Sequence, residues 1–143
     1  MKLTLVKGHL DTICHHVLAE LPSEACGLLV GLVCDNGTVY AVEDIWPATN
    51  VLAHQLGRFE IDPMLRLKVE KVCRDNGQKV IGHWHSHPNA PAQPSDTDLA
   101  LAYEPDLAWL IVSTLSASIA EINAFLPPKP DRLSFSPIDL QIT

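Results

Sequence analysis

The chain has 143 residues, of which 47% are hydrophobic, which is enough for one folded domain with its own core and too much for a disordered chain. Its net charge of −7 and pI near 5.3 argue against a nucleic acid or a membrane as partner, because anionic partners require a basic surface. We therefore expect a single domain over residues 1–143.

The first part of the chain predicts a helix followed by a hairpin. Apolar side chains recur at helical spacing over residues 9–21, and Pro22 ends this pattern because the residue before a proline disfavours helix. A continuous apolar run then leads into Asp35-Asn36-Gly37, which is a typical turn sequence. The two hairpin strands are expected at residues 25–34 and 38–45.

The middle of the chain predicts a loop, a short strand, a helix and a longer strand. The helix has clear signals at both ends, because Asp62 can cap its first turn and Gly77 can end it in a left-handed conformation. We expect these four elements at residues 46–57, 58–61, 63–75 and 79–85, respectively.

The last part predicts a stiff loop, a short helix and further strands. Three prolines within residues 88–94 exclude a helix interior or a central strand, since proline lacks the backbone N–H that both require. Ser95 is a good N-cap, which places Asp98 at the third helical position. Strands are expected at residues 107–115 and 119–126, with an edge strand near residues 133–136 in the proline-rich tail that begins at about residue 127.

His85-Ser86-His87, followed by Asp98, supplies three metal ligands at a workable spacing. Successive side chains of a strand point to opposite faces, so His85 and His87 share a face and can bind one ion. Asp98 adds an oxygen from the start of the next element. Two nitrogens and one oxygen leave a tetrahedral zinc ion one position short, which is typical of catalytic zinc, although this ligand set would also accept cobalt or iron.

The order His-x-His, seven residues, Ser, two residues, Asp resembles the signature of the JAMM (MPN+, Mov34/Pad1-type) metallopeptidases in their small prokaryote-like form. The resemblance extends from about residue 5 to residue 126 and includes Glu24, the segment Phe59-Glu60-Ile61-Asp62-Pro63, and Gly82. The predicted elements indicate an α/β or α+β fold. The resemblance implies, more specifically, the cytidine-deaminase-like MPN core, a mixed curved sheet flanked by helices.

The resemblance implies a role for each residue of the site. His85, His87 and Asp98 would bind Zn²⁺, Glu24 would be the general base, and Ser95 would hydrogen bond the developing oxyanion. Each of the last two has a plainer interpretation: Ser95 as a helix cap, and Glu24 as a solvated loop carboxylate. His83 shares the face of His85, but on a straight strand it lies about 13 Å from His87, so we expect it to pack rather than bind.

Small members of this family act on ubiquitin-like proteins, including sulfur carriers that end in Gly-Gly, or on their conjugates. The resemblance thus implies a protein substrate and hydrolysis of a peptide or isopeptide bond after Gly-Gly. We expect an extended peptide to pair with an edge of the strand that carries the histidines. The alternative is a non-catalytic MPN-type interaction module, but such members usually lack part of the ligand set. A zinc deaminase would need His-x-Glu and Pro-Cys-x-x-Cys, which this chain lacks.

The cysteines and the N-terminus predict a cytoplasmic protein. The four cysteines form no C-x-x-C pair and are expected to be reduced, and the first apolar run is too short for a signal peptide. Cys26 lies two residues after Glu24 and would face the same way on a strand, so a redox-sensitive thiol near the site is the alternative interpretation. The oligomeric state is left open by the sequence.

Overall fold

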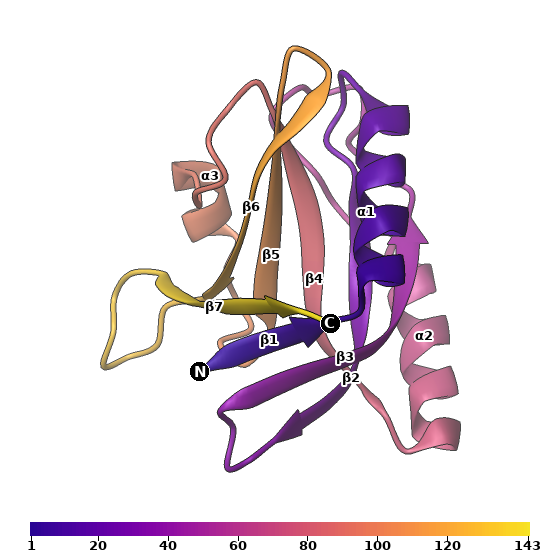
Figure 1. Ribbon diagram of the computed structural model, residues 1–143, viewed down its shortest axis with the longest axis vertical. Helices are drawn as coiled ribbons and strands as arrows, with labels where there is room; N and C mark the ends of the chain where they lie inside the picture. The colour runs from indigo at the N-terminus through magenta and orange to yellow at the C-terminus, as the bar shows by residue number, and fades with distance from the viewer.

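The strands of this chain form one curved sheet that closes into a barrel, as the computed structural model of residues 1–143 shows (Figure 1). The order around the barrel is β1-β3-β2-β4-β5-β6-β7, with parallel and antiparallel neighbours. The elements are β1 (Lys2–Leu5), α1 (Lys7–Glu20), β2 (Cys26–Cys34), β3 (Val39–Ala48), α2 (Pro63–Asn76), β4 (Lys79–Pro88), α3 (Asp96–Ala100), β5 (Ala108–Leu115), β6 (Ser118–Leu126) and β7 (Ser136–Ile142). The expected mixed curved sheet flanked by helices is confirmed.

Two of the expectations for residues 46–61 were wrong. The segment 58–61 forms only an isolated bridge, between Asn50 and Ile61, and the loop expected from residue 46 begins later because β3 continues to Ala48. Pro47 is tolerated in β3 because β1 pairs only with Val39–Ala41, so this end of the strand has a neighbour, β2, on one side only.

The two ends of the chain close the barrel, and this was not expected. The short strand β1 pairs in parallel with both β3 and β7, and the last strand covers Ser136–Ile142 rather than residues 133–136. The two termini consequently lie close together in Figure 1. Parallel pairing between the first and last residues is a long-range contact, which local sequence patterns do not report.

The two faces of β4 serve different purposes. Trp84 and Ser86 are fully buried on one face, where Trp84 joins the main core together with Ile13 and Val17 of α1. The histidines alternate with them on the other face, which is covered by α2 and by the segment around Ala92. Figure 1 shows α1 and α3 on either side of β4, β5 and β6. Because Trp84 fills the barrel interior, His85 and His87 point outward.

Two glycines allow β4 to sit between its neighbours. A Cβ atom on Gly27 of β2 would lie 2.4 Å from the Trp84 ring, and one on Gly82 would lie 2.5 Å from the Ala108 carbonyl oxygen. Both distances are well below van der Waals contact, so a larger residue at either position would displace β4. The site described below depends on this close packing.

Two further features concern the chain as a whole. All four cysteines are free, as expected: Cys14, Cys26, Cys34 and Cys73. No helix of the structure is both long enough and apolar enough to cross a membrane.

Candidate metal centre

The two histidines of β4 meet on the outward face of the strand. His85 is fully buried and His87 is 7% exposed, and their Nε2 atoms lie 3.0 Å apart. The alternation of the strand brings the two rings to the same side, as the sequence predicted. Two imidazole nitrogens that face each other at this distance form half of a site for a cation.

Asp98 completes the triangle from α3. Ser95 caps this helix: its hydroxyl oxygen accepts a hydrogen bond from the Asp98 N–H at 3.0 Å, and its own N–H donates to Asp98 Oδ2 at 2.9 Å. This reciprocal pair turns the Asp98 carboxylate back toward β4. Its Oδ2 atom consequently lies 3.4 Å from His85 Nε2 and 3.1 Å from His87 Nε2.

The three atoms have the spacing that a small cation requires. Two ligands at about 2.0–2.1 Å in tetrahedral geometry are about 3.3–3.4 Å apart, close to the separations found here. His87 also has an outer partner, because its Nδ1 lies 2.9 Å from the Pro91 carbonyl oxygen. With the proton on Nδ1, the lone pair of Nε2 is free to bind a metal. These residues therefore fit a divalent ion of the zinc type.

The electrostatics of the triangle favour an anionic Asp98. Burial alone would raise its pKa, but the nearby ring nitrogens of His85 and His87 and the hydrogen bond from the Ser95 amide hold the pKa of this carboxyl well below its usual range. Burial lowers the pKa of His85, so this ring is neutral near pH 7. Burial also acts to lower the pKa of His87, but hydrogen bonds to Asp98 and to Pro91 outweigh it and the pKa is raised. A buried carboxylate beside two imidazoles favours a positive charge at this centre.

Glu24 lies beside the triangle, just before β2. It is 5% exposed, and one carboxylate oxygen lies within 4.8 Å of a ring nitrogen of each histidine. Burial raises its pKa to about 7; the Asp98 charge adds to this shift and His87 opposes it. A carboxyl group with a pKa near neutrality can both accept and return a proton at physiological pH.

Ser86, between the two histidines, fixes the backbone next to Glu24. Its hydroxyl oxygen accepts a hydrogen bond from the Ala25 N–H at 2.8 Å, and its own N–H donates to the Ala25 carbonyl at 3.0 Å. No role for this serine was predicted from the sequence. No local signal identifies its partner, because the two residues are 61 positions apart.

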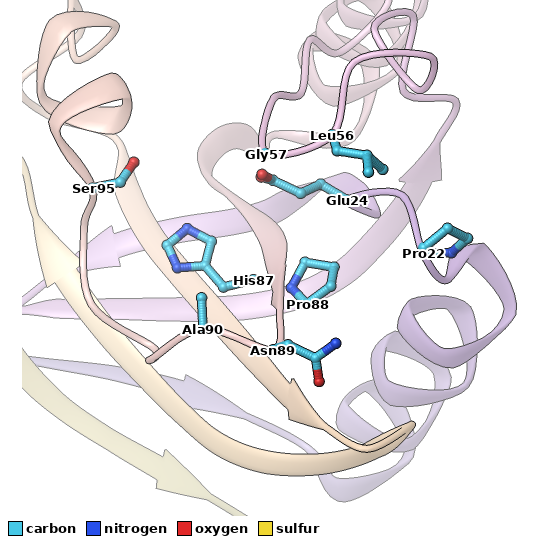
Figure 2. Close-up of a pocket in the computed structure, with 9 residues that line it drawn as sticks. All are labelled: Pro22, Glu24, Leu56, Gly57, His87, Pro88, Asn89, Ala90 and Ser95. Carbon is cyan, nitrogen blue, oxygen red and sulfur yellow. The ribbon is translucent and has the colours of Figure 1, made fainter.

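A groove of about 310 Å³ opens over the centre. Figure 2 shows the side chains of Glu24, His87 and Ser95 around it. The Ser95 oxygen accepts the Asp98 N–H through a lone pair, and its hydroxyl hydrogen can still donate. The groove is lined by Pro22, Glu24, Leu56, Gly57, His87, Pro88, Asn89, Ala90 and Ser95.

Two aromatic rings pack against His85. Phe59 stacks on it with ring centroids 4.3 Å apart and an angle of 15°, and Trp109 meets it edge-on at 5.4 Å. His83 packs against Trp109 at 4.4 Å, and burial lowers its pKa to about 3, so it is an uncharged packing residue as expected. The contact between Phe59 and His85 was not foreseen.

Cys26 faces the same side of the sheet as the centre, because it lies directly opposite His85 in the ladder between β2 and β4. Burial, together with the charges of Glu24 and Glu20, raises its pKa to about 12. The thiol is therefore protonated near neutral pH, which makes it a poor nucleophile and a poor redox sensor.

Comparison with known proteins gives a consistent set of relatives. Residues 6–126 match the family described as prokaryotic homologs of the JAB domain. A desampylase from Haloferax volcanii is 32% identical over 116 residues, covering 78% of this chain and 81% of the relative. A probable TtuB-protein conjugate cleaving protease from Thermus thermophilus is 33% identical over 127 residues, covering 89% of this chain and 77% of the relative.

Solved structures give the same picture of the fold. A Desulfitobacterium hafniense protein determined in solution is 33% identical and superposes with a TM-score of 0.84, covering 99% of this chain and 92% of its own. A JAB1/MPN domain protein from Archaeoglobus fulgidus superposes with a TM-score of 0.57, covering 100% and 99% of the two chains. At 22% identity this second likeness concerns the fold alone, and it confirms the expected MPN core.

Proposed function

The chain belongs to the family of prokaryotic homologs of the JAB domain, and we propose that it is a zinc-dependent peptidase or isopeptidase. Its substrate would be a ubiquitin-like or sulfur-carrier protein, cleaved after a C-terminal Gly-Gly. The observation that carries the proposal is the meeting of His85, His87 and Asp98 within 3.4 Å of one another, with Glu24 beside them at the floor of a groove. The desampylase and the conjugate-cleaving protease among its relatives support this substrate class.

Each residue of the site has one task in the proposed reaction. A bound zinc ion, held by His85, His87 and Asp98, supplies a Lewis acid and lowers the pKa of water to near 7. Glu24 accepts a proton at its carboxylate and returns it to the leaving amine, for which its near-neutral pKa is suited. The Ser95 hydroxyl donates a hydrogen bond to the carbonyl oxygen as negative charge develops there.

The groove favours a substrate tail with small residues. Its walls include two rigid prolines, Pro22 and Pro88, together with Leu56 and Ala90. Side chains next to the scissile bond would meet these walls, whereas glycines would not. The expectation that the peptide pairs with an edge of the histidine strand is wrong for most of its length, because β4 has β2 on one side as far as His85 and β5 on the other. The substrate tail would instead lie along the groove.

A matched pair of fusion proteins tests the substrate class. One carrier would end in Gly-Gly before the junction and the other in Ala-Ala, with zinc supplied to the enzyme. We expect cleavage after Gly-Gly, seen by mass spectrometry, at a rate at least about tenfold above that of Ala-Ala, since one methyl group in a tight site is worth about 1–3 kcal/mol. Equal cleavage of both carriers would show that glycine is not required before the scissile bond. Cleavage of neither carrier would favour the alternative function, a non-catalytic interaction module.

The Ser95→Ala variant tests the oxyanion role. Removing one donor of this kind typically lowers kcat by about 10²-fold or more, and loss of the cap on α3 would cost about 1 kcal/mol of stability. Ser95→Thr is the matched control, because threonine keeps both the hydroxyl and the ability to cap. We expect steady-state kinetics to show the loss in the first variant and most of the activity in the second. An unchanged kcat in Ser95→Ala would show that Ser95 acts only as a helix cap.

A further inference from the structure

The side-chain amide of Asn50 makes every hydrogen bond that it is able to make. It follows β3 and is 6% exposed. Its Nδ2 donates to the carbonyl oxygens of Glu24 and Arg58, both at 2.9 Å, and its Oδ1 accepts the N–H groups of Leu52 at 2.9 Å and Glu60 at 3.0 Å. Two donors and two acceptors are the full complement of an asparagine. One side chain thus joins three separate stretches of backbone.

The first of these stretches is the backbone of Glu24 itself. The bond from Asn50 to the Glu24 carbonyl is buried. On the following residue, Ser86 accepts the Ala25 N–H at 2.8 Å. The main chain that carries the Glu24 carboxylate is therefore held at two successive points, one from the loop after β3 and one from the histidine strand.

The second of these stretches includes Phe59. Asn50 bonds the carbonyl of Arg58 and the N–H of Glu60, which are the residues on either side of Phe59. The Phe59 ring in turn stacks on His85. His85 needs this support, because its buried Nδ1 has no hydrogen bond partner, whereas Nδ1 of His87 faces the Pro91 carbonyl at 2.9 Å. On the side of Nδ1, the His85 ring is therefore held by packing against its aromatic neighbours and not by a hydrogen bond.

We propose that Asn50 is a positioning residue that aligns the Glu24 carboxylate with the His85 ring. Its hydrogen bond to the Glu24 carbonyl holds the backbone of Glu24. Its hydrogen bonds to Arg58 and Glu60 hold Phe59 against His85. The same bonds fix the two ends of the segment that supplies Leu56 and Gly57 to the groove. The activity part of this inference rests on the proposed function, but the effect on the metal site does not. A small displacement at such a centre is costly, because outer partners of metal ligands typically contribute 10–100-fold in affinity or activity.

Two variants separate the donor side of Asn50 from its acceptor side. Asn50→Asp keeps oxygens that can accept the N–H groups of Leu52 and Glu60 but loses the Nδ2 donor to Glu24 and Arg58. Asn50→Ala loses all four bonds. Tyr40→Phe is the control for general loss of stability, because it removes one hydrogen bond, from the Tyr40 hydroxyl to the Asp106 carbonyl, outside the site.

Three measurements on each purified chain decide the question: zinc affinity by competition with a chelator, amide exchange at Leu52 and Glu60 by NMR, and kcat and KM on the Gly-Gly fusion. We expect both Asn50 variants to lose about tenfold or more in kcat and in zinc affinity. Amide exchange at the two positions should accelerate strongly in Asn50→Ala and much less in Asn50→Asp. Tyr40→Phe should match the native chain in kcat and in zinc affinity.

Wild-type kcat and zinc affinity in Asn50→Asp would overturn the proposal, because the hydrogen bonds that Nδ2 donates to Glu24 and Arg58 would then be dispensable. If neither Asn50 variant folds, Phe59→Leu decides in a chain where Asn50 is intact. It should lower zinc affinity by about tenfold, and an unchanged affinity would overturn the proposal. If the native chain cleaves no Gly-Gly fusion, the proposed function is wrong. Zinc affinity and amide exchange still test the role of Asn50 in that case.

Discussion

Replacing Glu24 by glutamine should leave the metal centre intact and reduce kcat by about 10²–10⁴-fold, the usual contribution of a general acid or base. Glutamine has nearly the shape of glutamate but cannot accept a proton. The backbone at this position is held by Asn50 and Ser86, so the amide should occupy the place of the carboxylate. The His85 and His87 nitrogens and the Asp98 oxygen, which form the closest triangle, are not altered.

The zinc content of the variant distinguishes the two roles that Glu24 could have. Its carboxylate lies within 4.8 Å of both histidines, which is also close enough for a metal ligand after a small movement. We expect one zinc ion per chain in Glu24→Gln by elemental analysis, with activity lost. Glu121→Gln, at an exposed position of β6, is the matched control and should keep both. A variant that loses zinc together with activity would make Glu24 a ligand instead of a base.

The sequence predicted the parts of the site that depend on local geometry. Alternation along a strand brings His85 and His87 to one face, and a serine N-cap places Asp98 in the first turn of a helix. Both rules act over a few residues. They require only that the strand and the helix exist, and each had clear signals in the prolines and capping residues around it.

The parts that were not predicted depend on contacts between distant segments. Asn50 sits in a loop and gives no periodic or capping signal, and its partners at Glu24 and Glu60 become visible only when the chain is folded. The same holds for β1 and β7, whose pairing joins the two ends of the chain. Such contacts are set by the closure of the barrel rather than by the propensity of either segment.

Asp98→Asn is the second variant for which we expect a large effect: loss of tightly bound zinc and, with it, loss of activity. Asp98 supplies the only anionic oxygen within 3.4 Å of both histidine Nε2 atoms. An asparagine can still accept the Ser95 N–H and so preserve the cap of α3. It brings no negative charge to offset that of a divalent cation, so the change removes charge from the site and leaves the fold in place.

Chelation of the native chain gives the comparison that this variant needs. A ligand at a thousand times its Kd stabilises the folded state by about 4 kcal/mol, so removal of zinc should lower Tm clearly, and added zinc should restore both Tm and activity. In Asp98→Asn, added zinc should raise Tm little and restore no activity. Asp96→Asn, in the same helical turn but exposed, should behave like the native chain. A fully active, zinc-loaded Asp98→Asn chain would make Asp98 a capping residue only, and the metal centre would then have to be formed by the two histidines with Glu24.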